Sequence, residues 1–120
     1  MVGAFAAGKI VSPLTARGQF VGGLVWGLGS ALLEKTEIDA RSARYVNDNL
    51  ADYLIAVNAD VCDIDAIVVP ESDSKVNALG AKGIGELANT GTAAAIAAAV
   101  HHATGKRVRH LPIRIEDLVS

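Results

Sequence analysis

Five glycines interrupt the longer of two helical patterns in this sequence, and they constrain how that helix can pack. Ser12 and Pro13 give a helix start, with serine as the N-cap and proline in the first turn. Apolar residues then recur at helical spacing to about residue 33 or 34. The glycines in this segment are Gly18, Gly22, Gly23, Gly27 and Gly29. Each costs about 1 kcal/mol relative to alanine inside a helix, so the pattern predicts close approach by another backbone, as in tight helix-on-sheet packing, or by a ligand.

The rest of the chain predicts an α+β fold with a second helix and about five short strands. This helix is expected at about residues 89–104, with Asn89 or Thr90 as its cap and Gly105 as its C-terminal stop. Extended segments are expected at 2–11, 36–38, 43–46, 54–57, 64–69 and 108–115, and residues 71–77 as a polar loop. We expect two main helices, about 13–34 and 89–104, to pack on a small mixed β-sheet in a single domain, residues 1–120.

Composition and charge exclude several classes of protein. Apolar residues make up 51% of the chain, which excludes a disordered protein, whereas aromatic residues make up only 4%. Because much of the apolar fraction is alanine, we expect a piece that packs tightly against something else. A net charge of −2 with scattered Lys and Arg argues against nucleic acid as a partner. Cys62 is the sole cysteine, so no internal disulfide can form.

Neither a membrane span nor an export signal is predicted. The most apolar stretch, residues 20–33, falls short of the ~20 residues that a span needs. Residues 1–11 have no apolar core followed by a small-residue cleavage motif. The expected location is the cytoplasm, with export alongside a partner left open.

The glycine-rich stretch from Gly80 to Glu86 is the most informative candidate site. Its glycines expose backbone N–H groups just before the second helix, where the helix dipole also favours anions. The spacing matches neither a P-loop nor a dinucleotide-binding fingerprint. Glu86 lies at the end of this stretch, near the expected start of the second helix. Its carboxylate is either a partner of the helix dipole or a positioned general base.

Few other polar residues offer chemistry. Gln19 is the only long polar side chain on the inner stretch of the first helix; its amide can donate to and accept from a ligand, or it is simply solvated. His101 and His102 are adjacent, so on a helix they point about 100° apart and cannot chelate one metal together. No metal-ligating set is predicted.

Four segments carry a resemblance when they are taken together. They are 18–34 around Gln19, 47–53 (Asn-Asp-Asn-Leu-Ala-Asp-Tyr), 80–86 (Gly-Ala-Lys-Gly-Ile-Gly-Glu) and 103–113 (Ala-Thr-Gly-Lys-Arg-Val-Arg-His-Leu-Pro-Ile). In this order they resemble the C-terminal part of the large, molybdopterin-binding subunit in the xanthine dehydrogenase/aldehyde oxidase family. The similarity covers essentially the whole chain.

The resemblance implies a molybdenum hydroxylase that oxidises an aldehyde or a nitrogen heterocycle. By resemblance, Glu86 is the catalytic base, which removes a proton from a hydroxyl on the metal. The cofactor is expected to be molybdenum-molybdopterin, in a dinucleotide form. The residues expected to border it are Gln19, Lys82, Gly83, Ile84 and Gly85.

The resemblance also implies partners. The remainder of the subunit would supply the other cofactor loops and most of the pocket for a small-molecule substrate. Iron–sulfur clusters and FAD on other domains or subunits would carry the electrons away. After Glu86, residues 87–89 stand where many relatives have prolines, so the pocket edge is expected to differ.

The 120 residues alone are expected to hold no cofactor, to be inactive, and to expose an apolar patch or self-associate as a homo-oligomer. The alternative interpretation is a non-catalytic structural or anion-binding module that keeps the fold without the chemistry.

Overall fold

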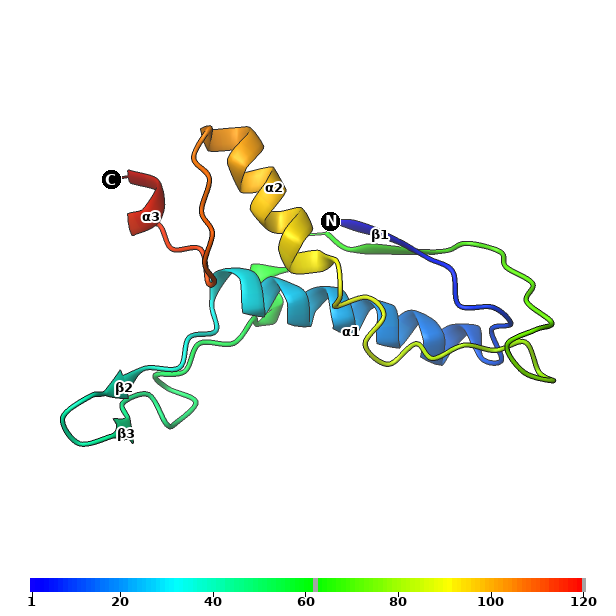
Figure 1. Ribbon diagram of the computed structural model, residues 1–120, viewed down its shortest axis with the longest axis horizontal. Helices are drawn as coiled ribbons and strands as arrows, with labels where there is room; N and C mark the ends of the chain where they lie inside the picture. The colour runs from blue at the N-terminus through cyan, green and yellow to red at the C-terminus, as the bar shows by residue number, and fades with distance from the viewer. Residues whose placement is uncertain (62, 120) are drawn as a thin grey trace.

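The computed structural model describes residues 1–61 and 63–119 as an elongated α+β molecule, 54 × 35 × 27 Å (Figure 1). Its elements in chain order are β1 (Val2–Phe5), α1 (Pro13–Leu32), β2 (Ile38–Asp39), β3 (Arg44–Tyr45), the 3₁₀ turn η1 (Asn58–Asp60), β4 (Asp65–Val68), α2 (Thr92–Thr104) and α3 (Glu116–Val119). The α+β expectation is confirmed. The sequence predicts that Cys62 is a buried small apolar residue, and this position lies outside the described part.

Helix α1 runs along the long axis and begins where the sequence predicts. Ser12 has an extended backbone, with φ −132° and ψ 103°, and Pro13 is the first helical residue. The helix ends at Leu32, one or two residues earlier than expected. The N–H groups of Leu33 and Glu34 both donate to the Gly29 carbonyl, at 2.9 and 2.8 Å, and this closes the last turn.

The strands form two separate pairs, so the expectation of a single mixed sheet is wrong. β1 pairs with β4 in parallel, in the register Val2↔Asp65 to Phe5↔Val68, and α1 packs against this pair. β2 and β3 form a small antiparallel hairpin that projects from the body (Figure 1). Residues 54–57 and 108–115 form no strand in the structure.

The strand expected over residues 2–11 ends at Phe5. The chain turns at Gly8, whose φ is +64°, a value that favours glycine. Gly8 then forms a single antiparallel bridge to Ala81.

The second helix begins at Thr92, three residues later than predicted. Residues 85–91 form consecutive turns, in which the Asn89 N–H donates to the Glu86 carbonyl (3.1 Å) and the Thr92 N–H to the Asn89 carbonyl (3.3 Å). The end is as predicted, because Gly105 takes the left-handed conformation (φ +74°). α2 packs on α1. Within residues 1–61 and 63–119, no helix has both the length and the apolar character that crossing a membrane requires.

The core is small and rich in alanine. Its buried apolar residues, among those described, are Ala7, Ala16, Phe20, Leu24, Ala31, Ala88 and Ile113. The rings of Phe5 and Phe20 stack with their centroids 4.7 Å apart. Other large apolar side chains stay outside it: Leu14 is 83% and Trp26 is 47% exposed.

The accessible surface and the radius of gyration of the chain are both large for its length, in keeping with so small a core. Its accessible surface is 8299 Å², against about 6,100 Å² for a compact monomer of this mass. The radius of gyration is 17.5 Å, against about 14 Å for a compact domain of this length. Much apolar surface is therefore left uncovered by the chain itself.

Candidate functional site

Four of the five glycines of α1 fall into two groups, and the first group is needed for packing. A Cβ at Gly23 would lie 2.8 Å from the Ala88 Cβ and 3.1 Å from the Asn89 backbone nitrogen. A Cβ at Gly27 would overlap the Thr92 side chain. These two glycines therefore let the segment before α2 lie directly on α1.

The second group has no such role within this chain. A Cβ built at Gly18 or Gly22 would meet no atom within 4 Å in the described residues beyond the helix's own nearby backbone. Both glycines are exposed, as is Gln19 between them. The sequence left two explanations open for the helix glycines. Backbone packing accounts for Gly23 and Gly27, and an uncovered surface remains around Gln19.

The glycine-rich loop is fixed at its beginning to the turn after β1. The Lys9 N–H donates to the Gly80 carbonyl at 2.8 Å, and the Lys82 N–H donates to the Ala7 carbonyl at 3.1 Å. These two bonds flank the bridge between Gly8 and Ala81. The loop therefore starts from a defined backbone position next to the core.

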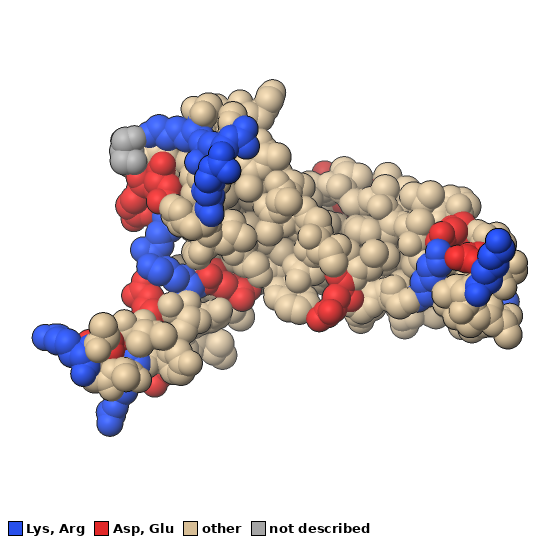
Figure 2. Space-filling view, viewed as in Figure 1, with Lys and Arg blue, Asp and Glu red and all other residues tan. Residues whose placement is uncertain are grey.

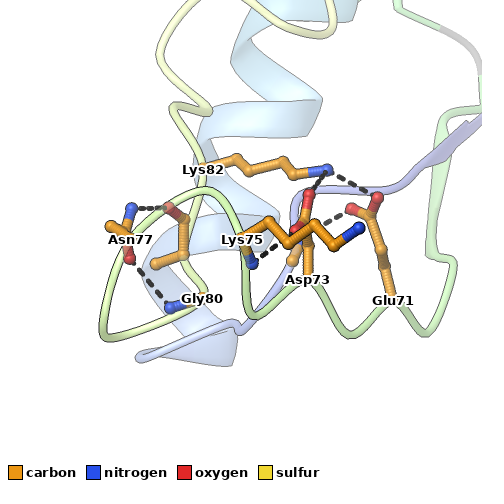
Figure 3. A network of polar contacts seen from close by, with 8 residues as sticks. Glu71, Asp73, Lys75, Asn77, Gly80 and Lys82 are labelled. Carbon is orange, nitrogen blue, oxygen red and sulfur yellow. Dashed lines mark hydrogen bonds and ion pairs between the residues drawn. The ribbon is translucent and has the colours of Figure 1, made fainter.

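The Lys82 side chain is held by two carboxylates from the preceding polar loop (Figure 3). Its Nζ lies 2.6 Å from Glu71 Oε1 and 3.1 Å from Asp73 Oδ2. Glu71 Oε2 also accepts a hydrogen bond from the Gly8 N–H at 2.7 Å. We call these three side chains, Lys82, Glu71 and Asp73, the Lys82 cluster.

The charges in the Lys82 cluster shift one another's titration. The hydrogen bond from Lys82, followed by that from the Gly8 N–H, lowers the pKa of Glu71. Hydrogen bonds from the Lys75 N–H and then from Lys82 lower the pKa of Asp73. The two carboxylates in turn raise the pKa of Lys82. All three groups are therefore charged at neutral pH.

Beyond Lys82 the loop runs along α1 and is fixed again at Ala88. Ile84 is half-buried against the core around Phe20, and Ala88 is 2% exposed where it meets Gly23. Between these two contacts, Gly85 and Glu86 are exposed. Glu86 thus stands on a short outward segment that is held at both ends.

Gln19 lies on the same side of α1 as this loop. In an α-helix, residues four apart differ by about 40° in direction, so Gln19 is one turn from Gly23 and close to it in angle. Leu24, by contrast, faces β1, where a Cβ at Gly3 would lie 3.3 Å from it. Helix geometry therefore places Gln19 one turn from Gly23, the residue on which Ala88 packs two positions after Glu86.

Sequence reasoning missed the carboxylates of the Lys82 cluster. From the sequence, residues 71–77 are only a polar loop. The available signal was a lysine inside a glycine-rich loop that follows two acidic residues, Glu71 and Asp73, but this spacing does not establish a contact. Asn77 was also missed: its Nδ2 donates to the Ala81 carbonyl at 2.8 Å, and its Oδ1 accepts from the Gly80 N–H at 2.8 Å.

The Asn-rich segment 47–53 forms turns. Asn47 bridges two strand-flanking groups: its Oδ1 accepts from the Glu37 N–H (2.9 Å) and its Nδ2 donates to the Lys35 carbonyl (2.6 Å). Asn49 Oδ1 accepts from the Ala51 N–H at 2.9 Å. These contacts account for the asparagines as structural residues.

No set of three or more His, Cys, Asp or Glu side chains that could hold a metal occurs in the described residues. His101 and His102 lie on α2, as expected.

Comparisons with known proteins give a consistent family. The model of the molybdopterin cofactor-binding domain matches residues 1–62. The chain is 41% identical over 120 residues to the aldehyde oxidoreductase molybdenum-binding subunit of Escherichia coli, covering 100% of this chain and 16% of that protein. It is 39% identical over 117 residues to a probable xanthine dehydrogenase subunit of Bacillus subtilis, covering 98% and 15%. The chain thus spans about one sixth of the length of these curated relatives.

Solved structures share the fold. The aldehyde oxidoreductase from Desulfovibrio desulfuricans matches with a TM-score of 0.86 and 35% identity, over 99% of this chain and 13% of that one. Quinoline 2-oxidoreductase from Pseudomonas putida matches with a TM-score of 0.86 and 30% identity, over 97% and 15%.

Proposed function

Because the chain belongs to the molybdopterin cofactor-binding domain family, we propose that it is part of the molybdenum-binding subunit of a hydroxylase for an aldehyde or a nitrogen heterocycle. Glu86 is its catalytic base, and Gln19 with the loop from Lys82 to Gly85 borders the cofactor. The relatives named as aldehyde oxidoreductase and xanthine dehydrogenase subunits support this activity.

The observation that carries the proposal is the pair of uncovered glycine surfaces beside the two polar candidates. Gly18 and Gly22 flank Gln19, and Gly83 and Gly85 precede Glu86; at none of these four glycines would a Cβ meet a neighbour within 4 Å in the described chain. A bulky cofactor can approach the backbone closely at such positions. The residues present therefore fit a molybdopterin group.

Each residue has a definite part in this arrangement. The Gln19 amide can both donate to and accept from polar atoms of the cofactor. The backbone N–H groups of Gly83 and Gly85 can donate to its anionic groups. When bound, the molybdenum cofactor supplies the redox chemistry, which the side chains of this chain do not provide. It is proposed to be a dinucleotide form.

Glu86 is suited to accept a proton during the reaction. A general base must come within about 2.6–3.2 Å of the atom that gives up the proton. Its segment is held at Ile84 and at Ala88, where the core and Gly23 fix the backbone. An exposed carboxylate on a segment held at both ends can reach a substrate that approaches from outside the chain.

The remaining surface calls for a large partner, which we propose is the rest of the subunit. Parallel strands are normally covered on both faces, and an isolated strand pair is marginal in stability, yet Ile67 of β4 is 48% exposed. Charged side chains gather mainly towards the ends of the molecule, and the face over its middle is largely uncharged (Figure 2). Iron–sulfur and flavin domains or subunits would complete electron transfer.

The test is Glu86→Gln in the complete subunit assembled with its partners. Glutamine keeps the size of the side chain and removes the proton acceptor. We expect molybdenum content to stay near the unmodified level, while turnover falls by about 10²–10⁴-fold. The matched control is Glu116→Gln, an exposed glutamate on α3, which should leave both unchanged. Near-normal turnover at full molybdenum content would contradict the assignment of Glu86 as the base.

A further inference from the structure

We propose that Lys82 is a positioning residue: by binding Glu71 and Asp73, its ammonium sets where the loop begins and so where Glu86 stands. This rests on the proposed function for the role of Glu86. The proposed function places the loop from Lys82 to Gly85 beside the cofactor, and this inference gives the Lys82 side chain a separate task within the protein.

The Lys82 cluster joins three segments that are far apart in the sequence. Glu71 accepts from the Gly8 N–H at 2.7 Å with one oxygen and from Lys82 Nζ at 2.6 Å with the other. The turn after β1, the loop after β4 and the start of the glycine-rich loop therefore meet at one carboxylate. Figure 3 shows the Lys82 side chain reaching across to both acids.

The backbone N–H and the side-chain ammonium of Lys82 both bind other groups of this chain. Its N–H donates to the Ala7 carbonyl, and its ammonium contacts both carboxylates. The three side chains are 29–32% exposed, so water screens them only in part. Without the lysine, Glu71 and Asp73 would face each other as like charges, since Asp73 raises the pKa of Glu71. Removing the ammonium should therefore push this end of the loop open.

The distance along the chain from this cluster to the proposed base is short. Glu86 follows Lys82 by four residues; half-buried Ile84 lies between them, and Ala88 on Gly23 follows Glu86. A displacement of about 1 Å in a reacting group can cost about 10²-fold in rate. Loosening the attachment at Lys82 should therefore lower turnover without removing the cofactor surface around Gln19.

The experiment compares four variants of the complete, molybdenum-loaded enzyme. Lys82→Met removes the charge at similar length, Lys82→Arg keeps it, and Glu71→Gln removes its partner's charge. Lys75→Met is the matched control, because Lys75 is an exposed lysine in the polar loop that also carries Glu71 and Asp73 (Figure 3). Amide exchange at residues 8, 9, 80 and 82, molybdenum content, kcat and KM are measured for each.

The positioning role predicts a specific combination of results. Lys82→Met and Glu71→Gln should each speed amide exchange at residues 8, 9, 80 and 82, whose N–H groups are hydrogen-bonded around the Lys82 cluster, by about three- to tenfold. Each should lower kcat by about tenfold or more, with KM within about twofold and molybdenum content retained. Lys82→Arg should recover most of the kcat, and Lys75→Met should match the unmodified enzyme.

Three results would overturn this role. The first is unchanged exchange in both Lys82→Met and Glu71→Gln. The second is loss of molybdenum in Lys82→Met with unchanged exchange, which would place Lys82 against the cofactor. The third is faster exchange with unchanged kcat in Lys82→Met, when the Glu86→Gln variant of the same enzyme is inactive. An active Glu86→Gln variant would instead refute the proposed function, and the exchange measurement would still report on the Lys82 cluster.

Discussion

Alanine at Gly27 and at Gly22 should have opposite effects on the stability of α1 and its neighbours. At Gly27 the added methyl would overlap the Thr92 side chain and lie 3.1 Å from Asn89 Oδ1. Thr92 cannot easily move away, because it is 4% exposed and its Oγ1 donates to the Ala88 carbonyl at 2.7 Å. Overpacking of this kind costs about 1–3 kcal/mol, against a helix-propensity gain of about 1 kcal/mol. The net loss should reach about 2 kcal/mol.

At Gly22 the same methyl would meet no neighbour within 4 Å in the described chain. Only the helix-propensity gain of about 1 kcal/mol then acts within this part of the protein. The methyl would, however, stand beside Gln19 on the surface proposed to face the cofactor. We therefore expect Gly22→Ala to keep α1 at least as stable and to lower molybdenum content.

Amide exchange across α1 and the first turn of α2, measured in the complete subunit, reads these local stabilities directly. A loss of about 2 kcal/mol corresponds to about 30-fold faster exchange. Molybdenum analysis of the same samples reports on the cofactor surface. If Gly27→Ala exchanged no faster than Gly22→Ala, the packing explanation for the buried glycines would be wrong.

Two further predictions concern the Lys82 cluster and the uncovered surface. The hydrogen bond from Lys82 lowers the pKa of Glu71 from its ordinary 4.5, so its stabilising contribution is present above pH 4.5 and is lost as the pH falls through the lowered value. Amide exchange over residues 71–82, corrected for intrinsic rates, should therefore rise only below about pH 4.5, and a rise already at pH 6 would refute this. The 120-residue chain alone should bind a hydrophobic dye or self-associate, because its surface exceeds that of a compact monomer; a clean monomer in sedimentation without dye binding would contradict this.

Local signals located the helix ends that depend on local chemistry. Ser12 and Pro13 mark the start of α1, and Gly105 marks the end of α2, because an N1 proline and a left-handed glycine act on the backbone beside them. The order of the four motif segments likewise identified the family before any fold was known. These features are readable because they need no distant partner.

Features that depend on distant contacts could not be predicted in the same way. The segment before Thr92 forms turns where helix was expected, and there Ala88 packs on Gly23, a contact between residues far apart in the chain. The strand expected to continue to residue 11 stops because Gly8 turns to meet Ala81. The partners of Lys82 are set by the same turn. Whether Glu86 and Gln19 serve the cofactor remains a prediction that the proposed variants test.

The parallel pairing of β1 with β4 imposes an order on how the chain assembles during synthesis. Val2 pairs with Asp65, so about 60 residues must be made before β1 can find its partner. At about 5–20 residues per second, β1 waits roughly 3–12 s on the ribosome. Helix α1 can form within microseconds of emerging, and Phe5 can then stack on Phe20. The helix can thus hold the first strand until β4 arrives. The Lys82 cluster closes once residues 71–82 have followed, and α2 packs on α1 after that.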